Sequence, residues 1–172
     1  MPRHVVLVGL PGSGKSTVGK LAAEALGTSG MDVDAFLVRQ MGMPISQIFG
    51  KYGEAEFRSM ERGAVQAALG GPPLVLVPGG GWAAQAGELD AARGVGIIIY
   101  LKCDAATAAK RSGQGEVRPL LMGEDPVARM RELLLARAPF YDRADHVLVT
   151  DQDPAPVVAQ NVARIAREAA GW

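Results

Sequence analysis

An apolar run, a glycine-rich loop and a helix-forming segment open the chain, and together they constrain the fold more than any other feature. Residues 9–16, Gly-Leu-Pro-Gly-Ser-Gly-Lys-Ser, fit the pattern GxxxxGK[ST] completely. The apolar run Val5–Val8 precedes them, and the helix-forming segment Lys15–Leu26 follows. Such a loop lets consecutive backbone N–H groups surround phosphate oxygens at a helix N-terminus. The order strand, loop and helix therefore predicts a phosphate-binding loop.

Some residues of this loop are expected to bind phosphate and others to bind a metal ion. Lys15 is placed to reach the β- and γ-phosphates of a nucleotide, and the Ser16 hydroxyl to bind a magnesium ion. The predicted ATP site also includes Gly12, Ser13, Gly14 and Thr17. We therefore expect ATP together with Mg²⁺. The same loop serves kinases, GTPases, motor ATPases and regulatory switches, so the acceptor must be identified from other residues.

Short apolar runs alternate with longer helix-like segments along the chain. The runs are Val5–Val8, Leu74–Val77, Val95–Leu101 and Val147–Val149, with a weaker run ending near Asp32. The helix-like segments are Lys15–Leu26, Glu54–Leu69, Pro126–Ala138 and Ala155–Ala169. Runs without polar alternation indicate strands buried on both faces, and their alternation with helices predicts an α/β domain with a parallel sheet.

The length of 172 residues suits one domain over positions 1–172. The segment Ser112–Asp125 contains glycine and shows no periodicity, which predicts a lid or a disordered loop.

Composition narrows the class of partners. The 18 basic and 18 acidic residues cancel, so no global field favours nucleic acid or an anionic membrane.

Cys103 is the single cysteine, which excludes a disulfide framework and a zinc-type cluster. The N-terminal apolar run is too short for a signal peptide, and no apolar stretch approaches the roughly 20 residues of a membrane span. We expect a cytoplasmic protein.

Two carboxylates follow the weaker second strand. Asp32 and Asp34 would lie on one side of an extended chain, at the edge of an open α/β sheet where ligands bind. One could hold a magnesium-bound water and the other an acceptor hydroxyl. Alternatively, Asp34 is the N-cap of the next helix. The residues alone do not decide between these interpretations.

Three arginines are candidates for binding an anionic acceptor. Arg58 is followed by Glu61 and Arg62 at helical spacing, which is also typical of a solvated ion-pair face. Arg118 lies in the aperiodic segment as Val-Arg-Pro-Leu-Leu. Arg137 follows three leucines and precedes Pro-Phe-Tyr, an unusual setting for a solvated charge.

Three consecutive glycines, Gly79, Gly80 and Gly81, follow the third apolar run and Pro78. Ordering three glycines is entropically costly, and one suffices for a turn. The stretch therefore predicts that another group comes closer to the backbone than a Cβ permits. The alternative is that Gly80 adopts a positive φ angle in a turn.

The motifs GxxxxGKS, Asp-x-Asp, Phe-Arg-x-x-Glu, Gly-Gly-Gly, Arg-Pro-Leu-Leu and Arg-x-x-x-Tyr occur in this order. Each is weak alone, but together the chain resembles the shikimate kinase family over essentially its whole length. The resemblance implies a three-layer P-loop kinase fold with a five-stranded parallel sheet of order 2-3-1-4-5 and a mobile lid over about 112–125. It also implies transfer of the ATP γ-phosphoryl group to the 3-hydroxyl of shikimate, in chorismate and aromatic amino-acid biosynthesis.

The resemblance also implies roles for individual residues. Arg58 and Arg137 would bind the shikimate carboxylate, and Asp34, within a substrate-binding segment of about 34–62, would orient or deprotonate the attacking hydroxyl. The acceptor would approach the backbone of Gly79, Gly80 and Gly81. Arg118 would act from the lid on phosphate and acceptor, Arg111 would lie against adenine, and Asp32 would hold magnesium through water. We expect a monomer that binds shikimate and ATP.

The sequence departs from the family pattern in two places. Val77-Pro78 stand where Ser or Thr often precedes the glycines, and Trp82 is bulkier than the small residue expected after them. Two alternatives to this family are a different small-molecule kinase, of the gluconate or nucleoside monophosphate type, and a non-catalytic nucleotide switch. A gluconate kinase would carry His-Pro soon after Asp-x-Asp, whereas the only histidines are His4 and His146.

Overall fold

The computed structural model describes residues 1–113 and 125–172. Arg118 and most of the predicted lid lie outside the described residues. Five parallel strands form one sheet in the order β2-β3-β1-β4-β5. The strands are β1 (His4–Val8), β2 (Gly30–Asp32), β3 (Val75–Val77), β4 (Gly96–Lys102) and β5 (His146–Val149). This order confirms the predicted sheet.

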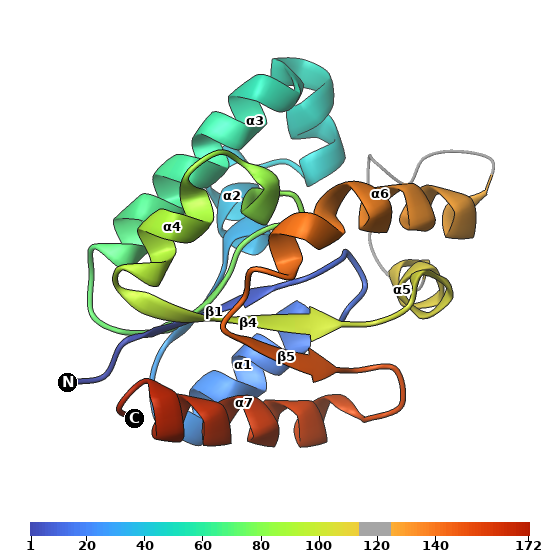
Figure 1. Ribbon diagram of the computed structural model, residues 1–172. Helices are drawn as coiled ribbons and strands as arrows, with labels where there is room; N and C mark the ends of the chain where they lie inside the picture. Colours follow the sequence, from blue (N-terminus) through green and yellow to red (C-terminus); the bar gives the residue numbers. More distant parts are fainter. Residues whose placement is uncertain (114–124) are drawn as a thin grey trace.

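Helices cover both faces of the sheet and make three layers (Figure 1). Two helices, α1 (Lys15–Leu26) and α7 (Ala155–Ala169), pack together on one face. The opposite face is covered by α2 (Val33–Met41), α3 (Ile45–Leu69), α4 (Glu88–Arg93) and α6 (Pro126–Tyr141). Alternate residues of each central strand point to opposite layers, so Val5 packs with α1 and α7 whereas Val6 packs with the other helices.

Burial distinguishes the central strands from the edge strands. Every residue of β1 and β3 is buried, as are all but the last of β4, which confirms the prediction of strands buried on both faces. That prediction is wrong for the edge strands: in β5, Val147 and Val149 are 50% and 59% exposed. An apolar run of valines therefore did not by itself establish a central position in the sheet.

Four helices lie where the sequence predicts them, and the differences have local causes. The helices α1 and α7 have the predicted bounds. Gly53, with φ 81° and ψ 167°, breaks α3, so the predicted helix from Glu54 is the second part of a longer element. Helix α6 continues through Pro139 to Tyr141. The short helices α2, α4 and α5 (Ala105–Ser112) were not predicted.

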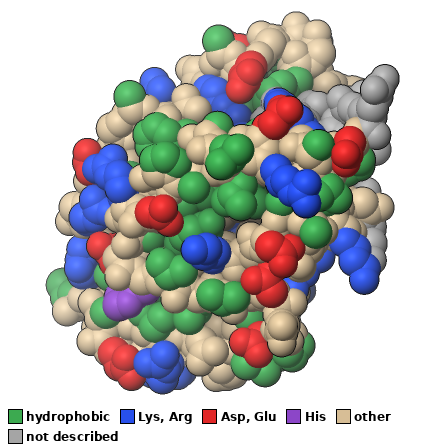
Figure 2. Space-filling view, turned by 45° about the vertical axis from the view of Figure 1, so that its right-hand side comes forward, with side chains coloured by type: hydrophobic (Ala, Val, Ile, Leu, Met, Phe, Trp, Pro, Cys, Tyr) green, Lys and Arg blue, Asp and Glu red, His purple; other side chains and the backbone are tan. Residues whose placement is uncertain are grey.

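The surface shows no segregation of charge on the face in Figure 2, where acidic and basic side chains alternate around a hydrophobic centre. This distribution agrees with the equal numbers of acidic and basic residues. Among the described helices, none has the length and apolar character that crossing a membrane requires.

Candidate active site

The glycine-rich loop connects the carboxyl end of β1 to the first turn of α1. Gly12 and Gly14 have φ angles of 79° and 89°, a conformation that is strained for residues with a Cβ. Lys15 is buried, and its Nζ donates to the backbone oxygens of Gly9 at 2.7 Å and Leu10 at 2.8 Å. The loop conformation thus keeps this ammonium group beside the backbone that is predicted to surround phosphate.

Arg111, the predicted adenine neighbour, is held near the same loop. Its Nη2 donates to the backbone oxygen of Thr150 at 2.7 Å and its Nη1 to the Thr150 hydroxyl at 3.4 Å. That hydroxyl is buried and donates to the backbone oxygen of Ser13 at 3.4 Å. Thr150 therefore links the end of β5, the arginine of α5 and the phosphate-binding loop.

The structure shows which of the two carboxylates at the end of β2 caps helix α2. Asp32 is the N-cap of α2, because its Oδ1 accepts from the backbone N–H of Ala35 at 2.9 Å. Its Oδ2 accepts from the Ser16 hydroxyl. Asp34 lies in the first turn of α2, so the alternative in which Asp34 caps the helix is wrong. The pair is also not extended, because β2 ends at Asp32 and the helix begins at Val33.

Both carboxylates and the phosphate-binding loop nevertheless line the same cavity, which has a volume of about 190 Å³. Its lining comprises Gly12, Gly14, Lys15, Ser16, Thr17, Asp32, Asp34, Val77, Pro78, Gly79 and Gly80. The described residues include no group of three or more His, Cys, Asp or Glu side chains that could hold a metal ion. The hydroxyl of Ser16 and the carboxylate of Asp32 still supply hard oxygen atoms beside the loop, which suits a magnesium ion held mainly by nucleotide phosphates and water.

Arg58 lies inside the protein. Its side chain is only 11% exposed, and its Nη1 pairs with Glu61 Oε1 at 2.9 Å. The other oxygen of Glu61 accepts from the backbone N–H of Gly79 at 3.1 Å. Burial raises the pKa of Glu61, and the adjacent Arg58 opposes that shift. The interpretation of this pattern as a solvated ion-pair face is therefore wrong.

Arg137 and Tyr141 project from the C-terminal half of α6 and are both buried. The Tyr141 hydroxyl donates to the backbone oxygen of Gly80. Burial raises the pKa of Tyr141 to about 12, although Arg137 acts in the opposite direction. The hydroxyl therefore remains protonated and can hold the glycine segment at neutral pH.

None of the three glycines has a positive φ angle, so the alternative that Gly80 adopts a positive φ angle in a turn is wrong. Glycine is required here because neighbouring side chains leave no room for a Cβ. A Cβ at Gly80 would lie 2.9 Å from Pro11 Cδ and 3.1 Å from Arg137 Nη1. A Cβ at Gly81 would lie 2.8 Å from Arg58 Cζ and 2.9 Å from Arg137 Nη2. The glycines thus let two guanidinium groups approach the backbone.

These two guanidinium groups retain unused hydrogen-bonding capacity. Arg58 Nε and Arg137 Nη1 are buried and have no hydrogen-bond partner among the described residues. Buried donors without partners are costly, and a bound anion would satisfy them. Two forked cations beside Gly80 and Gly81 form a site suited to a carboxylate.

Comparison with known proteins identifies the family. The shikimate kinase family model matches residues 11–168. The chain belongs to the shikimate kinase family. It is 41% identical to a shikimate kinase of Mycobacterium avium (strain 104) over 167 residues, which cover 96% of this chain and 94% of that protein. A solved structure of shikimate kinase from Acinetobacter baumannii in complex with shikimate has a TM-score of 0.92 and 34% identity, over 98% of this chain and 94% of that chain.

Family membership confirms the sequence-based identification of this protein as a kinase and transferase with a P-loop nucleotide site. A gluconokinase from Sinorhizobium meliloti 1021 also superposes, with a TM-score of 0.67 and 19% identity over 99% of this chain and 94% of that chain. At that identity the likeness shows a shared fold alone. The gluconate-type and switch alternatives therefore have less support than the shikimate kinase assignment.

The sequence analysis missed the contribution of Glu61. It was noted only as a partner of Arg58 at i+3, whereas the structure also joins it to Gly79. The signal available in the sequence was an acidic residue one turn after the arginine on a helix whose apolar face is buried. Local spacing does not reveal the second contact, because Gly79 is 18 positions away.

Proposed function

We propose that this shikimate kinase binds the carboxylate of shikimate between Arg58 and Arg137 and transfers the γ-phosphoryl group of ATP to the 3-hydroxyl. The observation that carries this assignment is the pair of buried guanidinium groups with N–H groups that lack a partner among the described residues. A carboxylate accepts charge-assisted hydrogen bonds from both groups at once. Neither adenine nor a neutral sugar would need two such groups.

Asp34 would orient the attacking hydroxyl and accept its proton. Its Oδ1 lies 3.1 Å from the position of a Cβ at Gly79, and it lines the same cavity as Lys15. An acceptor whose carboxylate lies near Gly81 and whose ring lies along Gly79 and Gly80 would bring a hydroxyl to this carboxylate. Positioning and charge neutralisation are the main demands of phosphoryl transfer, so a strongly basic group is not required.

The nucleotide would lie on the loop of Gly12, Ser13, Gly14, Lys15, Ser16 and Thr17, with adenine beside Arg111. Lys15 would exchange its contacts with Gly9 and Leu10 for phosphate oxygens. A magnesium ion, when bound, neutralises phosphate charge; Ser16 would ligate it directly and Asp32 through water. The Lys15 ammonium group already lies close to the loop, with its Nζ 2.7 Å from the backbone oxygen of Gly9.

The roles of Arg118 and of the lid remain predictions. Arg118 and the lid of about 112–125 fall largely outside the described residues. The monomeric state and the cytoplasmic location also remain predictions, and light scattering after size-exclusion chromatography would test the former.

The decisive experiment compares acceptors in a coupled assay of ADP release. We expect turnover with shikimate and little with gluconate or AMP. Methyl shikimate, which keeps the ring hydroxyls but lacks the negative charge, should have a KM about 10- to 100-fold higher, because at least one charge-assisted contact is lost. Equal KM values for the acid and the ester would contradict the carboxylate assignment, whereas turnover of gluconate or AMP alone would contradict the acceptor.

A further inference from the structure

A second buried polar cluster lies next to the glycine segment and has no role in the transfer proposed above. Trp82 begins the short helix η1 (Trp82–Ala84) and is 1% exposed. Its indole Nε1 donates to Glu88 Oε2 at 3.0 Å. The other oxygen, Oε1, pairs with Arg62 Nε at 3.0 Å. Glu88 is also buried, so each of its oxygens has one partner from a different element.

This cluster and Glu61 connect helix α3 to both ends of segment 79–88. Glu61 accepts from the backbone N–H of Gly79 at one end. Arg62, the next residue of α3, pairs with Glu88 at the other end. Between them, the backbone N–H of Trp82 donates to the Gly79 oxygen at 3.1 Å. The backbone that carries the glycines is thereby fixed to the helix that carries Arg58.

A buried carboxylate paired with arginine is weak evidence for stability, because desolvation offsets the attraction. A role in positioning the backbone explains a buried carboxylate at this place better than a role in stability does. A Cβ at Gly81 would already lie 2.8 Å from Arg58 Cζ, so a small displacement of this backbone alters the space beside the guanidinium group. The cluster prevents such a displacement, because it holds Trp82 immediately after Gly81.

We propose that Trp82 and Glu88, with Arg62, are positioning residues that hold the backbone of Gly79–Gly81 at the distance required for the acceptor. This proposal rests on the assignment of Arg58 and Arg137 to the acceptor. It predicts an effect on the binding of shikimate and not on that of ATP, because the hydrogen bond and ion pair of the cluster join residues of α3, η1 and α4, and not the phosphate-binding loop.

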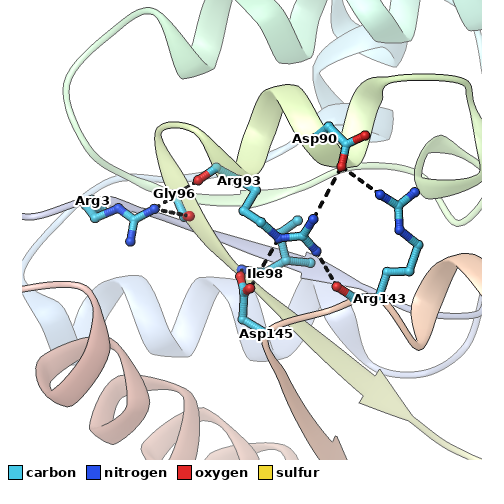
Figure 3. A network of polar contacts seen from close by, with 7 residues as sticks. All are labelled: Arg3, Asp90, Arg93, Gly96, Ile98, Arg143 and Asp145. Atoms are coloured by element: carbon cyan, nitrogen blue, oxygen red, sulfur yellow. Dashed lines mark hydrogen bonds and ion pairs between the residues drawn. The ribbon is translucent and has the colours of Figure 1, made fainter.

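Helix α4 supplies a matched control on its other side. Asp90 accepts from Arg93 at 3.3 Å and from Arg143 at 2.7 Å, and Arg93 also pairs with Asp145 (Figure 3). The Asp90 side chain is 63% exposed, and exposed pairs contribute little. The contacts drawn in Figure 3 connect α4 to the start of β4 and to the turn before β5, and none of them involves Gly79–Gly81. Asp90→Asn therefore removes an arginine-paired carboxylate of the same helix without affecting the proposed role.

The test separates positioning from stability. Trp82→Phe/Glu88→Leu removes donor and acceptor together, which leaves no buried polar group unsatisfied, and Arg62 is exposed enough to turn to solvent. We expect a melting temperature close to that of the unaltered protein and a KM for shikimate about five- to tenfold higher, as for one lost hydrogen bond. The KM for ATP and the kinetics of Asp90→Asn should change less than about twofold, as for exposed pairs.

A folded double variant with an unchanged KM for shikimate would overturn the proposal, as would equal increases for shikimate and ATP. If the double variant does not fold, Glu88→Gln serves instead: its amide accepts from Trp82 but cannot pair with Arg62, so a smaller increase for shikimate alone is expected. Arg58→Lys is measured in parallel. If Arg58→Lys leaves the KM for shikimate unchanged, the proposed acceptor site is wrong; if only the Glu88 variants do so, the positioning role alone is wrong.

Discussion

The nucleotide side and the acceptor side of the site are built by different means. On the nucleotide side, one short stretch supplies the machinery through its backbone, with Gly12 and Gly14 at positive φ and Lys15 on the adjoining turn. On the acceptor side, buried charged side chains converge from α3 and α6 on three glycines, none of which has a positive φ angle. Backbone conformation is encoded by neighbouring residues, whereas convergence requires the completed fold.

The difference also affects how each side responds to substitution. The loop tolerates few changes, since its glycine angles are strained for other residues. The acceptor side instead depends on pairs such as Arg58 and Glu61, in which the loss of one member leaves the other buried and charged. Substitutions on the first side should therefore affect turnover, and those on the second should affect acceptor affinity.

Lys15→Ala should give the largest effect and test the nucleotide half of the comparison. Removing a cation that neutralises the transferring group should lower kcat by about 10³-fold, the range seen when one transition-state donor is lost. Steady-state kinetics at saturating ATP and shikimate measure this effect, and circular dichroism checks the fold. Turnover near that of the unaltered enzyme would exclude a catalytic role for Lys15.

Arg58→Ala and Arg137→Ala test the acceptor half. Each should raise the KM for shikimate by about 10- to 100-fold, because one charge-assisted contact contributes about 1.5–3 kcal/mol. The KM for ATP should stay nearly constant. Lys at either position should restore binding only in part, since an ammonium group lacks the planar fork. A loss confined to ATP affinity would assign these arginines to the wrong ligand.

Gly80→Ala tests the place where the two sides meet. The added methyl group would approach Pro11 of the loop and Arg137 of α6, at 2.9 Å and 3.1 Å. Because Arg137 must retract, we expect the KM for shikimate to rise about tenfold, comparable with one weakened charge-assisted bond. The KM for ATP should rise as well, because Pro11 Cδ, 2.9 Å from the added methyl group, is bonded to a backbone nitrogen of the phosphate-binding loop. Thermal melts with each ligand provide the control: normal shikimate binding by a merely destabilised variant would contradict the close-approach explanation.

The contrast between local sequence elements and contacts made by the completed fold explains which features could be predicted from the sequence. The parallel sheet and the loop were predictable because each apolar run and GxxxxGKS is a contiguous stretch of sequence, whereas the strand order was implied by the resemblance to the shikimate kinase family. The sequence left open whether Asp34 caps the next helix and did not identify Asp32 as the cap, since the end of a three-residue edge strand leaves little periodicity to locate the boundary. Two contacts arise from tertiary packing, that of Glu61 with Gly79 and that of Glu88 with Trp82. No local sequence pattern predicts them.

Thr150→Val should give the smallest effect and sharpen the comparison from the nucleotide side. Valine keeps the shape of threonine but removes the hydroxyl that accepts from Arg111 and donates to Ser13, both at 3.4 Å. These bonds are long, and Arg111 keeps its 2.7 Å bond to the backbone oxygen of residue 150. We therefore expect the KM for ATP to rise by only about two- to threefold, less than the loss of one ordinary hydrogen bond, with the KM for shikimate unchanged. Isothermal titration with a non-hydrolysable ATP analogue would measure the same difference without turnover. An increase confined to shikimate would show that Thr150 acts through the acceptor side, and the division between the two sides would then not hold at the end of β5.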